Sequence, residues 1–196
     1  MGETDSLNEK ENGAPPHLSE LQANTLYPSA SDLPPEPPRA VLSNYDRFFV
    51  IDFMKGGHDQ YIYRHNNGLC VIGLAPSHIA VDNDASVIAV DFNVGKRSRT
   101  EMKASGKRKS DACVLEPTSA LCKVVCNNAE YIIRCCVRGA LLEVNERLVK
   151  DPTLLNTKAA SEGYIAIMMP RPADWNKASA SFLTAAEYLK RKPPRQ

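Results

Sequence analysis

Apolar residues recur at the short spacing of β-strands along much of the chain, and segment 135–168 shows the pattern most clearly. Valine, leucine and isoleucine are enriched there, as strands favour. Gly139 is predicted to bend the run, because glycine adopts backbone angles that other residues avoid. Pro152 opens a turn, and Gly163 precedes a last apolar run at 164–168. The segment therefore predicts a strand, a glycine turn, a second strand, a helical or coiled connection and a closing strand.

Alternating apolar residues between turn residues predict further strands earlier in the chain. They form two hairpins, 60–64 with 69–74 and 121–126 with 130–137, and two single strands, 85–92 and 113–115. The hairpin turns contain Asn66-Asn67-Gly68 and Asn127-Asn128, and both residue types tolerate left-handed backbone angles. The aromatic cluster at 44–51 is predicted to be an anchoring segment along an edge of the domain.

The chain of 196 residues is predicted to form one mainly β domain, residues 41–175, between two terminal segments. Residues 1–40 hold seven of the fourteen prolines and many polar residues. Such a segment buries too little apolar surface to offset the entropy of ordering, so we predict a disordered, acidic, Pro-rich tail. Residues 176–196 are predicted to form a short helix and a basic tail.

The C-terminal segment has its own pattern of signals. Pro170 and Pro172 are expected to stop the sheet, because proline has no backbone N–H for a strand ladder. A short amphipathic helix is predicted over 182–189, with Ser181 as its N-cap. Its narrow apolar stripe, which includes Leu189, is expected to dock on the domain.

Charge is unevenly distributed, although the net charge is only +1. Seven acidic and two basic residues give residues 1–40 a charge of −5, which leaves +6 for the remainder. A moderately basic body could meet an acidic partner surface, and the same charge is also compatible with ordinary solubility. No apolar run approaches the length of a membrane span.

The six cysteines are predicted to be reduced and packed in the core. They lie at positions 70, 113, 122, 126, 135 and 136, and the acidic N-terminus lacks an apolar signal segment. A zinc site from the last four was considered, because thiolates are common zinc ligands. Cys135 and Cys136 would point to opposite faces of one strand, so four thiolates could not converge there.

Catalytic chemistry is not indicated by the sequence, so we expect that the protein is not an enzyme. No phosphate loop or motif of paired carboxylates is present. His78 could act as a base, but no Ser or Cys with a third orienting group accompanies it. A histidine at the end of a strand is more often a structural hydrogen-bonding residue.

The matching positions for a first resemblance are Gly139, Glu143-Val144-Asn145-Glu146, Pro152, Leu154-Leu155-Asn156 and Glu162-Gly163-Tyr164-Ile165. In this order they resemble the C-terminal half of lipoyl and biotinyl carrier domains, most closely the glycine cleavage H-protein. The resemblance implies a mainly β fold of the barrel-sandwich hybrid type. It implies less about function, because one fold hosts many activities.

A carrier domain presents its modified lysine at the tip of the preceding hairpin, and that position falls on or beside Asn128 here. Lys123 lies several residues away in the strand. An amide side chain cannot form the lipoyl or biotinyl amide bond. No cofactor is therefore expected.

A second set of segments covers more of the chain: Asn67 to His78 (NGLCVIGLAPSH), Ala104 to Lys109 (ASGKRK), Leu121-Cys122-Lys123, Cys136 to Gly139 (CVRG), Leu142 to Glu146 (LEVNE) and Ser161 to Ala166 (SEGYIA). These segments are similar to the Abitram family, also called Simiate, from about Tyr45 to Lys190. The resemblance implies a non-enzymatic protein that binds actin, modulates its polymerisation and has a transcription-linked role in the nucleus, including nuclear speckles. The alternative is a carrier-domain relative that acts as a protein-interaction module without a modifiable lysine.

Two basic clusters are the feature that most invites a partner: Lys96, Arg97 and Arg99, then Lys107, Arg108 and Lys109. We predict that these six residues form a binding surface for an acidic partner, because the surfaces of actin and of nucleic acid are both acidic. Nine residues separate Arg97 from Lys107, so the clusters also imitate a two-part nuclear import signal. A solvated loop of repelling charges is an equally simple interpretation. Together with the family resemblance, the clusters predict that the protein occurs in both nucleus and cytoplasm.

Overall fold

The computed structural model describes residues 43–81, 86–95, 98–102, 113–127 and 129–193. Its strands are β1 (Tyr45–Val50), β2 (Gln60–His65), β3 (Cys70–Leu74), β4 (Val87–Asp91), β5 (Val114–Leu115), β6 (Ala120–Cys126), β7 (Glu130–Arg134), β8 (Gly139–Val144), β9 (Ala166–Met169) and β10 (Leu183–Thr184). Its helices are α3 (Arg147–Lys150), α4 (Leu154–Thr157), α5 (Pro172–Ser179) and α6 (Ala185–Arg191), with 3-10 turns η1 (Ile79–Val81) and η2 (Arg99–Glu101).

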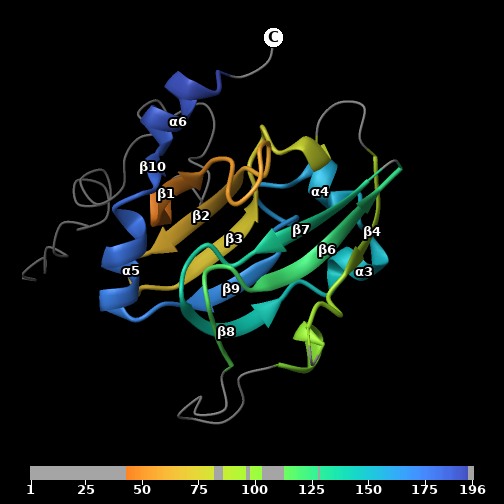
Figure 1. The fold of residues 1–196 in the computed structure, drawn as a ribbon, viewed down its shortest axis with the longest axis horizontal. Coiled ribbons are helices and arrows are strands. Elements are labelled where there is room, and N and C mark those ends of the chain that lie inside the picture. Colours follow the sequence, from red (N-terminus) through yellow and green to blue (C-terminus); the bar gives the residue numbers. More distant parts are fainter. Residues whose placement is uncertain (1–42, 82–85, 96–97, 103–112, 128, 194–196) are drawn as a thin grey trace, which may run out of the picture. The chain divides into compact units, whose positions relative to one another are not determined.

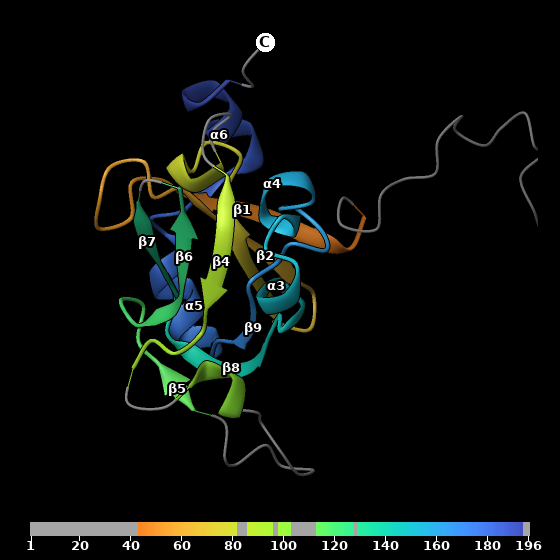
Figure 2. The same ribbon diagram turned by 90° about the vertical axis from the view of Figure 1, so that its right-hand side faces the viewer.

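Two antiparallel sheets make up the β body. The larger has seven strands in the order β10-β1-β2-β3-β9-β8-β5, and the smaller has three in the order β4-β6-β7. Figure 1 shows the β6–β7 hairpin crossing in front of β3 and β9. Seen from the side in Figure 2, α3 and α4 lie next to β4. The predicted mainly β fold class is confirmed, and the two sheets do not close into a single barrel.

The core lies between the two sheets, because alternate residues of each strand point to the same side. From the larger sheet, Ile62, Ile72 and Met168 are fully buried. Leu121 and Ile133 of the smaller sheet are also fully buried and belong to the same cluster. This apolar contact is the main source of stability for the fold.

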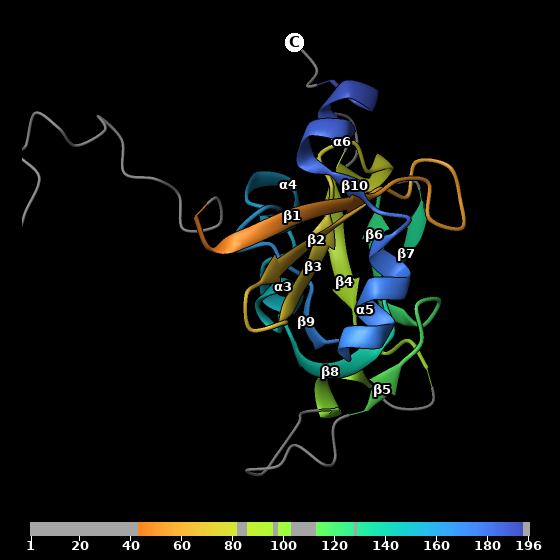
Figure 3. The same cartoon turned by 90° about the vertical axis from the view of Figure 1, so that its left-hand side faces the viewer.

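A second apolar cluster covers part of the other face of the larger sheet. Phe49 of β1 stacks on Tyr188 of α6, with ring centroids 4.0 Å apart. Tyr61 and Tyr63 of β2 are stacked beside them at 4.1 Å. In Figure 3, α6 lies at the end of β1 and β10. Both faces of β1 and β2 therefore carry packed side chains.

Both predicted hairpins form, and the first has the predicted turn. β2 pairs with β3 from Gln60↔Leu74 to Arg64↔Cys70, and β6 pairs with β7. In the first turn Gly68 has a φ of 89°, which a side chain disfavours. The aromatic segment at 44–51 is more than an anchoring segment, since β1 pairs with both β2 and β10.

The role predicted for Gly139 is wrong. It does not bend the chain but begins β8, and it is not among the glycines with positive φ. A Cβ on Gly139 would lie 2.9 Å from the backbone nitrogen of Pro170. Glycine is needed there because β8 and the end of β9 approach closely.

The C-terminal segment also differs from its prediction. Pro172 does not only end the sheet but occupies the first turn of α5, where its missing N–H costs nothing. The N-cap of α6 is Thr184 rather than Ser181, and Leu189 remains 53% exposed. Trp175 of α5 is buried against Phe48 of β1, so this segment packs on the larger sheet. The predicted domain boundaries stay predictions, and the 1–40 tail lies outside the described residues.

Candidate functional site

The β6–β7 hairpin is the place where a carrier domain would present its lysine. The backbone N–H of Cys126 donates to the carbonyl of Ala129 at 2.8 Å, which closes the turn. Lys123 is the one lysine of the hairpin. It pairs with Ile132 within the ladder, and its Nζ forms an ion pair with Glu130 at 3.4 Å. Asn128 itself lies outside the described residues. Lys123 is therefore held along the strand and not at the tip.

Five of the six predicted partner-binding residues lie outside the described part of the chain: Lys96, Arg97, Lys107, Arg108 and Lys109. The prediction for the sixth residue, Arg99, is corrected by the structure, because its side chain is buried. Its side chain is 8% exposed, its Nε donates to the carbonyl of Ala120 at 2.9 Å, and a terminal nitrogen lies 3.2 Å from the sulfur of Met102. A guanidinium used inside the fold is not available to a partner. Arg99 is a structural residue.

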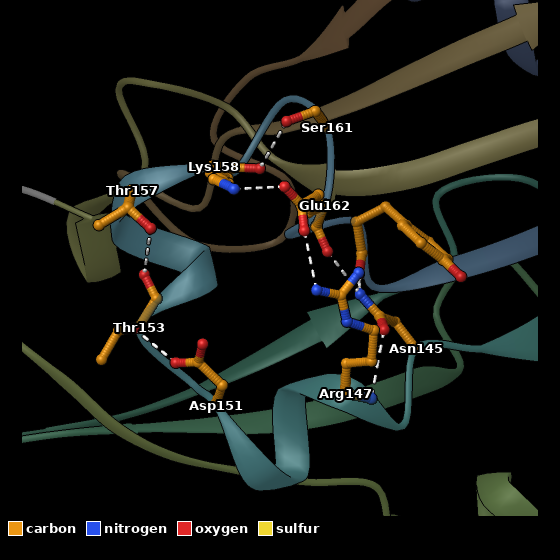
Figure 4. Close-up of polar contacts among 9 residues, drawn as sticks. Asn145, Arg147, Asp151, Thr153, Thr157, Lys158, Ser161 and Glu162 are labelled. Atoms are coloured by element: carbon orange, nitrogen blue, oxygen red, sulfur yellow. Dashed lines mark hydrogen bonds and ion pairs between the residues drawn. The ribbon is translucent and has the colours of Figure 1, made fainter.

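The connection between β8 and β9 is a polar corner (Figure 4), and Asn145 is at its centre. The Asn145 amide is buried and donates to the carbonyls of Glu162 and Tyr164, both at 2.8 Å. Its carbonyl oxygen accepts the backbone N–H of Arg147 at 3.3 Å. One side chain thus joins the start of α3 to the chain that leads into β9.

Charges on the outside of the same corner reinforce it. The carboxylate of Glu162 forms ion pairs with Arg147 at 2.8 Å and with Lys158 (Figure 4). Hydrogen bonds from Lys158 and then Arg147 lower the pKa of Glu162. All three groups are at least one third exposed, so the pairs are worth little individually. The corner is a scaffold that fixes backbone geometry, and it has no arrangement of groups suited to catalysis.

A buried polar cluster lies where β3 ends. Asp59 is fully buried, and it accepts the hydroxyl of Ser77 at 2.5 Å and pairs with Lys192 at 3.4 Å. The hydroxyls of Ser77 and Tyr188 are 2.7 Å apart. These contacts link α6 and the residue after it to the loop before β2. They anchor the C-terminal helix on the body.

The two histidines beside this cluster do not activate Ser77. His78 accepts the backbone N–H of Ala80 through Nδ1 at 3.0 Å, which confirms it as a structural hydrogen-bonding residue. Its ring packs against His58 and Tyr131, and burial together with the charge of His58 lowers the pKa of His78 to about 4. The Ser77 hydroxyl is bonded to a carboxylate and a phenol instead of an imidazole. A serine–histidine pair is therefore not formed here.

All six cysteines are free thiols, and the prediction of core packing is confirmed for five of them. Cys113 is the partly exposed one. Burial raises the pKa of Cys70 and of Cys135 to about 12. Protonated thiols are poor nucleophiles and poor metal ligands. Among the described residues, no group of three or more His, Cys, Asp or Glu side chains could hold a metal ion.

Surface cavities are the features that sequence reasoning missed. One of about 340 Å³ lies between β1 and α5, lined among others by Phe53, Arg138 and Phe182. Another of about 230 Å³ lies on the outer face of the larger sheet and contains Tyr45, Tyr63 and Tyr164. Their residues come from distant parts of the sequence, so no local motif could reveal them. In the described part of the chain, no helix is long and apolar enough to cross a membrane.

Comparison with known proteins identifies the family. No family model matches the chain. Protein Abitram of Bos taurus is 38% identical over 165 residues, which cover 81% of this chain and 87% of that protein. Protein Abitram of Homo sapiens is 35% identical, covering 76% and 86%. The chain belongs to the Abitram family.

Membership of the Abitram family extends to distant organisms, since Protein Abitram of Dictyostelium discoideum is 37% identical over 67% of this chain and 73% of that protein. The fold has a separate counterpart. A glycine cleavage system H protein from Mycobacterium marinum aligns with a TM-score of 0.52 over 76% of this chain and 98% of that protein, at 17% identity. This likeness shows the fold alone, and it confirms the predicted carrier-like, barrel-sandwich hybrid architecture for this Abitram protein.

Proposed function

We propose that this protein is a non-enzymatic actin-binding protein that regulates actin polymerisation and filament dynamics, with a transcription-linked role in the nucleus. The observation that carries the proposal is membership of the Abitram family. Resemblance to that family implies the activity, and nothing in the chemistry of the described residues favours catalysis instead. Ser77 has no imidazole partner, and Lys123 is not at a hairpin tip.

The burial of Arg99 removes one residue from the proposed actin-binding surface. It reduces the basic surface to five residues: Lys96, Arg97, Lys107, Arg108 and Lys109. Arg99 is the last residue of the first cluster, and its backbone N–H donates to the carbonyl of Phe92 at 3.0 Å. Arg99 is therefore fixed against Phe92 and Ala120 inside the fold. A cationic surface complements actin and nucleic acid, which are both acidic, and its attraction is screened by salt.

Co-sedimentation of the full chain with actin filaments at two salt concentrations, with a pyrene polymerisation assay alongside, tests this function. Replacing the five basic residues by serine, with Arg99 kept, should weaken binding and flatten its salt dependence. The control removes the same charge from five other exposed positions: Lys55, Lys150, Arg171, Lys177 and Lys190. An equal loss of actin binding in both variants would show that net charge, and not these five positions, determines binding. Neither binding nor any change in polymerisation by the wild type would reject the proposal.

A carrier-domain relative that acts as a protein-interaction module, without a modifiable lysine, is the second candidate. The likeness to an H protein favours it, together with the ion-paired position of Lys123. Intact mass of the protein isolated from its source should show no increment that corresponds to a lipoyl or biotinyl group. An added lipoyl or biotinyl group would overturn this candidate and revive carrier chemistry. If no such group is found, affinity capture from nuclear extract would identify the partner of the unmodified module.

Localisation in both nucleus and cytoplasm is part of the proposal, and the two clusters would act together as an import signal. A fluorescent fusion should lose its nuclear fraction when Lys107, Arg108 and Lys109 are replaced by serine. The control fusion carries Lys150, Arg171 and Lys177 as serine, which changes the charge equally. An unchanged nuclear fraction in the first fusion would show that the clusters do not direct import.

A further inference from the structure

A continuous row of side chains crosses the outer face of the larger sheet. The strand register pairs Arg47 with Tyr63, Tyr63 with Val71, Val71 with Ile167, and Ile167 with Glu143. Residues paired directly across antiparallel strands point to the same face, so the five form one line across β1, β2, β3, β9 and β8. In Figure 3, β1, β2 and β3 of this sheet lie in front of β4.

The middle of this row is an open groove of about 230 Å³. Its lining residues are Tyr45, Tyr63, Val71, Ala160, Ser161, Tyr164 and Ile167. The neighbouring part of the same face is closed by α6, through the stacking of Tyr188 on Phe49. The groove is therefore the part of an aromatic sheet face that the chain's own helix leaves open.

The rings of Tyr45 and Tyr164 are partly exposed along the groove, whereas Tyr63 lines it while only 6% exposed. In the described part of the chain, no hydrogen bond involves the hydroxyl of Tyr45 or of Tyr63, and Tyr45 is the more exposed of the two. The hydroxyl of Tyr164 donates to Glu143 at 2.7 Å and so places that ring at the far wall. Proline-rich segments match such walls, because their rings pack on aromatic faces and their carbonyls need donors while prolines offer no N–H.

Charge at the two ends of the row sets the chemistry of the occupant. Arg47 stands at one end, close enough to Tyr63 to lower its pKa against the larger effect of burial. Glu143 stands at the other end, exposed to solvent. Four strand spacings of about 4.8 Å separate the two, roughly 19 Å. A polyproline helix rises about 3.1 Å per residue, so about six residue steps span that distance.

We propose that this groove binds a proline-rich segment of a partner protein in polyproline II conformation, with an acidic residue beside Arg47 and a basic residue beside Glu143. Extended proline-rich segments lose little entropy on binding, so a shallow groove suffices. The proposal rests on none of the five basic residues of the proposed actin surface, so the two proposals can be tested separately. Failure of one proposal leaves the other standing.

Amide chemical-shift mapping of the 15N-labelled full chain is the test. The probe is the synthetic peptide Asp-Pro-Pro-Ala-Pro-Pro-Arg, whose charged ends are six residues apart, and the control peptide has alanine for every proline. Saturating shifts at Tyr45, Val71, Tyr164 and Ile167 with the first peptide alone are expected. Absence of saturation at millimolar peptide would overturn the proposal. So would equal shifts with both peptides, or shifts centred on the cavity near Phe53.

Two variants separate the ring and charge contributions. Tyr164→Ala should weaken binding about tenfold, because a hydrophobic wall is lost. Arg47→Glu should weaken binding of the probe about threefold, yet leave unchanged a peptide with Asn in place of Asp. Arg171→Glu, the same charge change on the N-cap of α5, is the control. An equal loss of peptide affinity with Arg47→Glu and Arg171→Glu would overturn the placement of the acidic peptide residue beside Arg47. Retained dispersion of the amide signals will show that each variant is folded.

A second copy of this chain is the other possible occupant, and dilution distinguishes it. Spectra without peptide, recorded from high to low protein concentration, should show constant positions for Val71 and Ile167. Concentration-dependent shifts confined to the groove, together with a dimer in sedimentation, would assign the groove to self-association and overturn the proposal.

Discussion

The imidazole of His78 is fully buried beside a second histidine, and this makes the protein sensitive to acid. In the fold, Nδ1 accepts the N–H of Ala80, so a proton added there would break that hydrogen bond. Burial and then the charge of His58 lower the pKa of His78 to about 4, from the usual value of 6.5. Burial also lowers the pKa of His58.

Stability should therefore fall as the pH falls from about 6.5 to about 4. In this window the unfolded chain binds a proton at His78 and the folded chain does not, so the full stabilisation exists only above pH 6.5. The shift corresponds to about 3 kcal/mol. Urea denaturation at pH 7, 6, 5 and 4.5 will measure it. His78→Gln should show a shallower pH dependence, and identical slopes for both proteins would contradict this account.

Gly163 should not tolerate alanine. A Cβ at this position would lie 2.3 Å from the carbonyl oxygen of Leu154, a backbone atom that cannot move alone. We expect Gly163→Ala to lower the free energy of unfolding by about 2 kcal/mol or more, as overpacking does. Gly56→Ala is the control, because nothing lies within 4 Å of its Cβ position. Chemical denaturation of both will compare them, and a neutral Gly163→Ala would mean that the corner relaxes.

Among the elements, α6 is held by a capping box. The hydroxyl of Thr184 accepts the N–H of Glu187 at 3.4 Å, and the Glu187 carboxylate accepts the N–H of Thr184 at 2.8 Å. That contact lowers the pKa of Glu187. Thr184 also pairs with Phe48 of β1, so one residue ends a strand and starts a helix. A loosened cap would therefore weaken the hold of α6 on the sheet.

Replacing Thr184, the N-cap of α6, should lower the free energy of unfolding more than replacing Ser181, the N-cap predicted from the sequence. Thr184→Ala is expected to lower stability by about 1 kcal/mol. Ser181→Ala should cost less, because the Ser181 hydroxyl donates to the carbonyl of Ala178 and caps no N-terminus. Thermal unfolding by circular dichroism will rank the two variants. The reverse ranking would assign the N-cap to Ser181.

The elements that could be predicted from the sequence are those with local signals. The β2–β3 hairpin follows from alternating residues around a turn with Gly68, and the β6–β7 hairpin from apolar residues around two asparagines. α5 was not predicted, because Pro172 alone does not distinguish the end of a sheet from the first turn of a helix. In β4 a bulge between Val87 and Ala89 breaks the alternation, which leaves Ile88 exposed.

The candidate sites depend on tertiary contacts, and the sequence therefore revealed less of them. Arg99 stands in a basic cluster, and only the position of the Ala120 carbonyl shows that it is buried. The resemblance to Abitram and to carrier domains predicted the family and the fold correctly. The groove unites Tyr45 with Tyr164, which are more than a hundred positions apart, and no short motif encodes that contact.

At the scale of the whole molecule, Gln60 joins the two sheets. It lies in β2 of the larger sheet, and its amide reaches Arg134 at the end of β7 in the smaller one. The side chain donates to the Arg134 carbonyl at 2.8 Å and accepts the Arg134 N–H at 3.2 Å. The Gln60 side chain thus makes the two hydrogen bonds that a neighbouring strand would make to Arg134 at the edge of the smaller sheet. Both backbone groups depend on it, and Gln60 is 2% exposed.

Gln60→Leu should lower the free energy of unfolding by about 1–3 kcal/mol, because the two backbone groups of Arg134 would be left without partners. Arg134→Ala retains those backbone groups and should cost less than about 1 kcal/mol. Urea denaturation will compare them, and hydrogen exchange of the Arg134 amide should become faster in Gln60→Leu. Unchanged exchange would show that the amide has another partner.

The burial of five thiols makes the protein a reporter of its own unfolding. Cys113 is the partly exposed thiol, and the other five are buried in the core. A thiol-specific chromogenic reagent should label about one cysteine per native molecule within minutes and all six after denaturation. The slow labelling in native buffer then measures spontaneous opening of the core through the protein's own cysteines, without an engineered label. Fast labelling of all six in native buffer would contradict the packing described.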